Sequence, residues 1–111
     1  MSSQRVTIID QERTVVAKAR VAKQEGYYAG VVDLRPMSAP LRQHFEEYEE
    51  IVNNQLFGLL DQIEKKIEAF PLRVVFEDGD EADLADVQVF PSIKKVSFTV
   101  VKDGVRRASG F

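Results

Sequence analysis

The segment from Tyr27 to Arg35 holds the side chains best suited to binding a small molecule. It places two tyrosines, a glycine, an acid and a base within a run of nine residues. Tyr27 and Tyr28 offer aromatic faces for stacking, and Arg35 offers a guanidinium that can hold a phosphate or carboxylate. Arg106 and Arg107 could add two further guanidinium groups. These five residues are the predicted site for an anionic or nucleotide-like ligand. The alternative is an ordinary strand whose tyrosines pack on a helix.

Two other groups of side chains have simpler explanations than catalysis or metal binding. His44 is the only histidine and lies within helical reach of Glu47, but a lone histidine is more often an ordinary surface residue than an acid–base catalyst. The acidic residues between Asp78 and Asp83 could attract a hard cation, but the Asp78-Gly79 dipeptide indicates a hairpin turn. The sequence has no phosphate-binding glycine loop and no nucleophile motif. We therefore predict no catalytic residue, no metal site and no cofactor, and enzymatic activity is the less favoured hypothesis.

Length and composition indicate one small globular domain. The chain has 111 residues, of which 44% are hydrophobic and 30% are charged, so we predict a single domain over residues 1–111. The absence of cysteine excludes disulfides and thiolate metal sites. A net charge of -3 argues against a nucleic-acid partner. The first residues lack a signal-peptide pattern and no apolar run is long enough to span a bilayer, so we expect a cytoplasmic protein without a membrane partner.

The strongest periodic pattern lies between Ser38 and Pro71. Apolar residues recur there at steps of three and four, which is typical of an amphipathic α-helix. Ser38 suits the N-cap position, and Pro71 ends the pattern. Asn53, Asn54 and Gly58 lower the helix propensity, but the apolar stripe keeps its phase across them. We therefore predict one continuous helix of about 30 residues, roughly 45 Å long.

Short strands flank this predicted helix on both sides. Residues 105–111 either add a short edge strand or trail as a tail. The predicted fold class is α+β, with six short, mostly antiparallel strands in the order βββ-α-βββ. They form a bent sheet or small barrel, and the one long amphipathic helix packs on it. The predicted strands cover residues 4–10, 13–24 and 27–34 before the helix, and 72–77, 84–90 and 96–101 after it.

The apolar stripe of the predicted helix broadens in its middle. A helix that packs on one sheet needs only one apolar face, whereas Ile51, Phe57 and Leu60 lie off the main line of the stripe. The extra apolar surface indicates a second contact, most simply with another copy of the chain. Coverage by a loop or by the C-terminal tail is the alternative. The residues of the predicted homodimer interface are Phe45, Tyr48, Val52, Leu56, Phe57 and Leu60.

These features lead to two functional hypotheses. The first is a non-catalytic cytoplasmic domain, regulatory or structural, that acts by self-association and by binding an unknown protein partner. The second is a small-molecule sensor for an anionic or nucleotide-like ligand. A small six-stranded barrel with one helix resembles, in outline, the PilZ-like cyclic dinucleotide receptors. However, Asp33-Leu34-Arg35 departs from that family's [D/N]-x-S-x-x-G motif and no R-x-x-x-R run precedes it, so the sequence is not assigned to that family.

Overall fold

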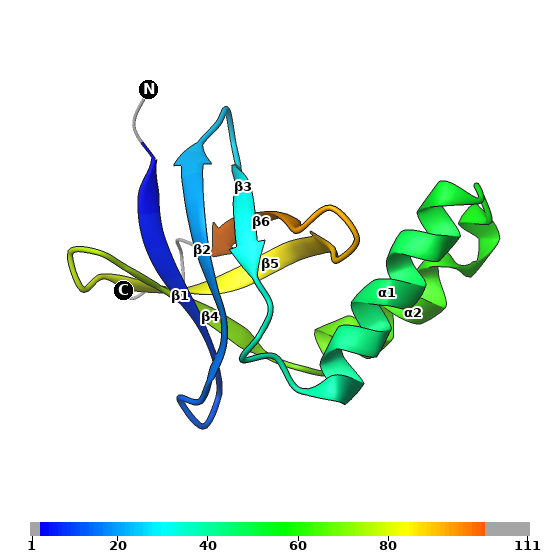
Figure 1. The fold of residues 1–111 in the computed structure, drawn as a ribbon, viewed down its shortest axis with the longest axis horizontal. Helices are drawn as coiled ribbons and strands as arrows, with labels where there is room; N and C mark the ends of the chain where they lie inside the picture. Colours follow the sequence, from blue (N-terminus) through cyan, green and yellow to red (C-terminus); the bar gives the residue numbers. More distant parts are fainter. Residues whose placement is uncertain (1–2, 102–111) are drawn as a thin grey trace, which may run out of the picture.

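The computed structural model describes residues 3–101, which form a closed β-barrel with a helical hairpin at its side (Figure 1). All neighbouring strands are antiparallel and follow the order β1-β2-β3-β6-β5-β4, and β4 pairs back onto β1. The six predicted strands are confirmed, and the sheet they form is a closed barrel. Residues 105–111, predicted as an edge strand or tail, lie outside the described residues. The strands are β1 (Gln4–Asp10), β2 (Val15–Lys23), β3 (Tyr28–Asp33), β4 (Leu72–Phe76), β5 (Glu81–Phe90) and β6 (Lys95–Val101).

Alternating side chains explain why these segments form a barrel wall. In β2, Ala17, Ala19 and Val21 are buried, whereas Lys18 and Arg20 between them are exposed. Successive side chains of a strand point to opposite faces, so the small apolar residues fill the barrel interior and the charged residues meet water. The period-two pattern in the sequence therefore predicts both the strand and its buried face.

Gly30 allows β3 to lie very close to β2. It pairs with Val21 in the register of these two strands. A Cβ atom added at Gly30 would lie 1.9 Å from the carbonyl oxygen of Arg20, far inside van der Waals contact. A side chain at this position would push β2 away, so the absence of a side chain is what permits the close approach.

The prediction of one continuous helix is wrong. The chain forms α1 (Ala39–Asn53), then the short 3-10 helix η1 (Phe57–Leu59), then α2 (Leu60–Glu68). Gln55 adopts a positive φ of 58°, and the Asn54 side-chain amide donates a hydrogen bond to the Glu50 carbonyl oxygen at 2.9 Å. The break therefore falls at the asparagine pair that lowers the helix propensity. No helix within residues 3–101 has the length and apolar character needed to cross a membrane.

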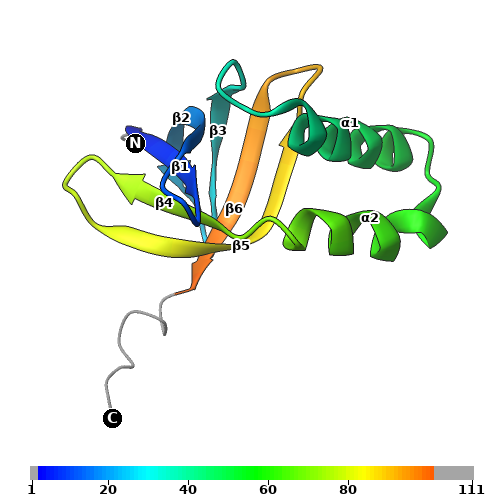
Figure 2. The same ribbon diagram turned by 90° about the horizontal axis from the view of Figure 1, so that it is seen from below.

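Packing between the two helices explains why the chain reverses. A straight helix of about 45 Å would extend well past a domain of this size. Folded into a hairpin, α1 and α2 lie side by side (Figure 1, Figure 2), and each contributes apolar residues to one shared core. The buried apolar residues of the hairpin are Leu41, Phe45, Tyr48 and Ile51 from α1, and Ile63 and Ile67 from α2.

Two contacts hold α1 against β5 and the turn that follows it. The Tyr48 ring stacks on Phe90 of β5 with 6.0 Å between ring centroids. Glu49 is buried, and its carboxylate accepts a hydrogen bond from the Ser92 backbone N–H at 3.1 Å and a second from the Ser92 hydroxyl. Ser92 belongs to the turn between β5 and β6, so these contacts fix the hairpin to the barrel.

Candidate functional site

The two tyrosines predicted to bind a ligand lie at the start of β3 and have different surroundings. The Tyr28 ring stacks on Phe98 with 5.4 Å between ring centroids and lies 5.5 Å from the Phe76 ring. The barrel itself therefore already provides the stacking partners of Tyr28. Tyr27 belongs to the turn between β2 and β3, and its side chain is exposed.

Arg35 lies beyond the other end of β3. It is seven residues after Tyr28, which corresponds to about 23 Å along an extended strand. Its guanidinium donates hydrogen bonds to Asp33, with 2.7 Å between Arg35 Nη2 and Asp33 Oδ2. Hydrogen bonds from Arg35 lower the pKa of Asp33 to about 2. The structure does not bring Arg35 into one pocket with the tyrosines, and Arg106 and Arg107 lie outside the described residues.

The six residues of the predicted dimer interface fall into two groups. Phe45 and Tyr48 on α1 are buried within their own chain, where they form part of the core. The single-chain fold therefore already covers these two side chains. The other four are less covered: Val52 and Leu60 are half-buried, and Leu56 and Phe57 are exposed.

Three exposed apolar side chains form what we call the hairpin tip. Leu56, Phe57 and Leu59 are 48%, 57% and 46% exposed. They belong to the connection between α1 and α2, at the end of the hairpin that points away from the barrel (Figure 1, Figure 2). Residues 51–60 carry no charge, although 30% of the whole chain is charged. Adjacent exposed apolar side chains on an otherwise polar surface are typical of a contact site for another molecule.

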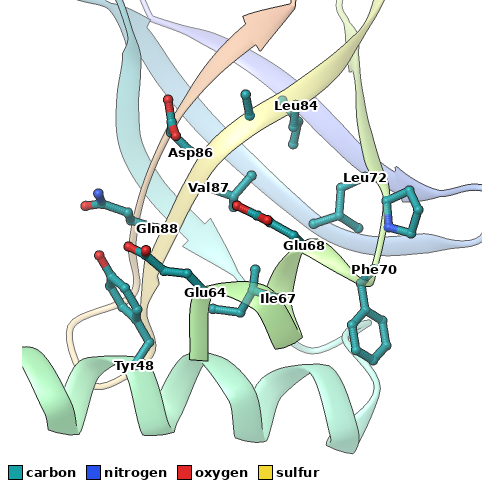
Figure 3. A pocket seen from close by; sticks show the side chains of 12 residues that line it. Tyr48, Glu64, Ile67, Glu68, Phe70, Leu72, Leu84, Asp86, Val87 and Gln88 are labelled. Carbon is teal, nitrogen blue, oxygen red and sulfur yellow. The ribbon is translucent and has the colours of Figure 1, made fainter. Parts of the chain in front are cut away.

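A second candidate site is a cleft of about 360 Å³ between the helical hairpin and the barrel (Figure 3). We call it the junction cleft. The acidic side chains of Glu64, Glu68 and Asp86 line it, the first two from α2 and the third from β5. Among residues 3–101, no lysine or arginine lines it. Its apolar lining residues include Ile67, Phe70, Leu72, Leu84 and Val87.

A bulge in β5 positions Asp86 at this cleft. The pairing between β5 and β6 shifts its register between Ala85 and Gln88. Such a bulge places an extra residue in one strand and redirects its side chain. Asp86 adopts a positive φ of 51° within the bulge. The Thr99 hydroxyl donates to the Ala85 carbonyl oxygen at 3.1 Å and approaches Asp86 Oδ2 at 3.4 Å, which braces this irregular segment.

Tyr48 lines the junction cleft from the α1 side. Its side chain is 6% exposed, and Figure 3 shows its hydroxyl directed toward Glu64 and Gln88. Burial raises the pKa of the Tyr48 hydroxyl, and the negative charge of Glu64 raises it further. The phenol therefore remains protonated at neutral pH. Within residues 3–101, this hydroxyl takes part in no side-chain hydrogen bond to another protein group.

Two acidic residues of the hairpin between β4 and β5, Glu81 and Asp83, form ion pairs with arginines. Arg13 Nη2 lies 2.7 Å from Glu81 Oε2, and Arg73 Nη1 lies 2.5 Å from Asp83 Oδ1. The hydrogen bond from Arg13 lowers the pKa of Glu81, and the charges of both arginines add to this effect. Within the described residues, no group of three or more acidic or histidine side chains is placed to hold a metal ion. The Asp78-Gly79 hairpin turn is confirmed, with Gly79 at a positive φ of 95°.

His44, the other residue considered for chemistry, packs against an aromatic ring. It lies on α1 with its ring 5.5 Å from that of Phe70, in an edge-to-face arrangement. His44 is absent from the lining of the junction cleft. Its observed contact is thus that of a packing residue at the base of the hairpin.

Comparison of the chain with known protein families, with characterised proteins and with solved structures finds no match. The geometry of the two candidate sites is therefore what supports a function.

The junction cleft is not among the sites expected from the sequence. The sequence does contain one indication of the cleft. Glu64 and Glu68 are four residues apart, and like charges at this spacing destabilise a helix, so this pair is unfavourable for the helix alone. The position of Asp86 opposite α2 depends on the bulge and on the reversal of the helical hairpin. Neither can be deduced from local residue patterns.

Proposed function

We propose that the protein is an interaction module whose copies associate through the hairpin tip. The observation that carries this proposal is the concentration of exposed apolar side chains. Of the seven large apolar side chains that are exposed within residues 3–101, three fall within four consecutive positions at the tip. This segment projects away from the barrel, where no other part of the described chain covers it (Figure 1).

The absence of charge in residues 51–60 favours a second copy of the chain as the occupant. Each copy carries a net charge of -3, so identical acidic surfaces would repel one another. Glu50 precedes the uncharged segment and Asp61 follows it, which leaves the tip as a neutral region between charged flanks. In a two-fold contact, the same three apolar side chains of each copy meet across the axis.

The size of the tip indicates a weak dimer. Each of its three side chains exposes about half of its surface, or on the order of 100 Å² for a large apolar side chain. Two tips would then bury on the order of 600 Å², compared with about 1,200 Å² or more for stable complexes. We therefore expect an equilibrium between monomer and dimer that depends strongly on protein concentration.

Light scattering coupled to size-exclusion chromatography tests this proposal when the loading concentration is varied. The wild-type protein is expected to shift from monomer toward dimer as its concentration rises. Phe57→Glu places a charge in the tip, and burying two such charges is strongly unfavourable. This variant is expected to stay monomeric over the same range.

Ile93→Glu is the matched control. Ile93 is 59% exposed, close to the 57% of Phe57, but it lies in the turn between β5 and β6. The control is expected to dimerise as the wild type does. A wild-type protein that is monomeric at every concentration would overturn the proposal, as would a Phe57→Glu variant that dimerises normally.

A further inference from the structure

We infer that the junction cleft binds an organic cation, namely an ammonium or guanidinium group carried on an apolar stem. Glu64, Glu68 and Asp86 supply three carboxylates around one cavity. Neither glutamate forms an ion pair within residues 3–101. Glu64, Glu68 and Asp86 are all exposed, so their carboxylates are accessible to a cation from solution.

The arrangement of these carboxylates favours an organic cation over a metal ion. Hard metal ions require several oxygen ligands at one point. Within the described residues, no three acidic or histidine side chains are close enough together to hold a metal. A guanidinium carries five N–H donors spread over a plane, and it can bridge acceptors that do not converge.

The buried Tyr48 hydroxyl gives a second and independent reason to expect a ligand. Buried hydroxyl groups in proteins nearly always have a hydrogen-bond partner. Tyr48 is 6% exposed, and its hydroxyl points into the cleft without a partner in the described chain (Figure 3). An N–H donor of the ligand would bond to this oxygen, and the neighbouring Glu64 would compensate the ligand's charge.

The remaining lining of the cleft suits the stem of such a ligand. Ile67, Leu72, Leu84 and Val87 provide apolar surface beside the carboxylates. A cavity of about 360 Å³ lies in the range of small-molecule sites. Long basic side chains and alkyl amines combine an apolar stem with a charged head in this way. The same chemistry occurs in a free diamine and in an arginine side chain of a peptide.

Nuclear magnetic resonance titration at low ionic strength tests this inference. The two probes are agmatine, a free guanidinium amine, and a capped Leu-Arg-Leu peptide. Binding of either probe is expected to shift the amide signals of residues 64–68 and 84–88. A response to agmatine shows that a free small-molecule cation is sufficient, whereas a response to the peptide alone identifies an arginine side chain within a peptide as the ligand.

The variant Glu64→Gln/Glu68→Gln removes two charges from the cleft and keeps the shapes of both side chains. It is expected to weaken binding by about tenfold or more, because charge-assisted hydrogen bonds to guanidinium are lost. Tyr48→Phe removes only the hydroxyl and is expected to weaken binding by a smaller factor. Both variants leave the apolar lining in place.

Glu25→Gln is the charge control, because Glu25 is exposed in the turn between β2 and β3 and is not part of the cleft. It is expected to change the affinity by less than about twofold, as a distant and screened charge should. The inference is overturned if neither probe binds, if the shifted signals lie away from the cleft, or if Glu25→Gln weakens binding as much as the cleft variant does.

Discussion

The Glu49 carboxylate on α1 accepts two hydrogen bonds from Ser92, one from the backbone N–H at 3.1 Å and one from the hydroxyl. Glu49 is only 9% exposed, so it is a buried acid whose charge is satisfied by a single turn of the barrel. Residues 49 and 92 are far apart in the sequence, and this pair joins the helical hairpin to the strands.

Glu49→Ala should therefore destabilise the protein. Loss of the carboxylate removes two hydrogen bonds to a charged acceptor, although Ser92 lies in an exposed turn where water can replace that acceptor in part. We expect the free energy of unfolding to fall by about 1–2 kcal/mol in urea denaturation. Glu50→Ala is the control, because Glu50 is the exposed neighbour on the same helix. Equal effects of the two substitutions would show that the Glu49–Ser92 contact adds no stability.

Gly30→Ala should destabilise the barrel. The new Cβ atom would lie 1.9 Å from the Arg20 carbonyl oxygen, so β2 and β3 would have to separate. Overpacking that forces the backbone to move costs about 1–3 kcal/mol and occasionally more. Gly58→Ala provides the contrast, because nothing lies within 4 Å of a Cβ at that position. Thermal denaturation that shows the two variants to be equally stable would contradict the close approach of β2 and β3.

Gln55→Gly tests the break between the helices, because the hairpin and a continuous helix predict opposite signs. In the hairpin, Gln55 has a φ of 58°, which glycine adopts without steric cost. Relief of this strain should stabilise the protein by about 1 kcal/mol. In a continuous helix, the same substitution would destabilise it by about 1 kcal/mol. Urea denaturation distinguishes the two results.

Arg35→Ala should raise the pKa of Asp33 from about 2 toward its ordinary value. Since the native pKa lies below the unfolded one, this pair stabilises the fold above about pH 4. The stabilisation is lost as the pH falls through the native pKa of about 2. The effect on stability should be small, because the Arg35 side chain is 90% exposed. Carboxyl chemical shifts of Asp33 measure the change, and an unchanged pKa would show that Arg35 is not its partner.

The strands could be predicted because their pattern is local. Alternation of Ala17, Ala19 and Val21 with charged residues defines β2, and Asp78-Gly79 defines the turn after β4. The helix break could not be predicted with the same certainty, since the apolar stripe continues in phase across residues 53–58. The chain reverses because α1 packs on α2, and this packing brings together residues that are not neighbours in the sequence.

The residues of the candidate sites could also be predicted only where a local sequence pattern decides whether they are exposed. Phe57 is identifiable as an apolar residue off the main stripe, but its exposure and that of Leu56 depend on the reversal that places them at the hairpin tip. Phe45 and Tyr48 belong to the same predicted interface, yet both are buried in the core of their own chain, where Tyr48 stacks on Phe90. Tyr27, Tyr28 and Arg35 are neighbours in the chain, but an extended strand holds Arg35 away from the tyrosines.

Cysteine cross-linking tests most directly whether copies of the chain meet at the hairpin tip. The chain contains no cysteine, so Gln55→Cys introduces a single thiol beside Leu56 and Phe57. A disulfide requires the two Cα atoms to approach within about 7 Å. We predict that oxidation links Gln55→Cys into a covalent dimer, and that adding Phe57→Glu prevents it. Cross-linking of Glu25→Cys on the barrel at the same rate, or no dimer from Gln55→Cys, would contradict association through the tip.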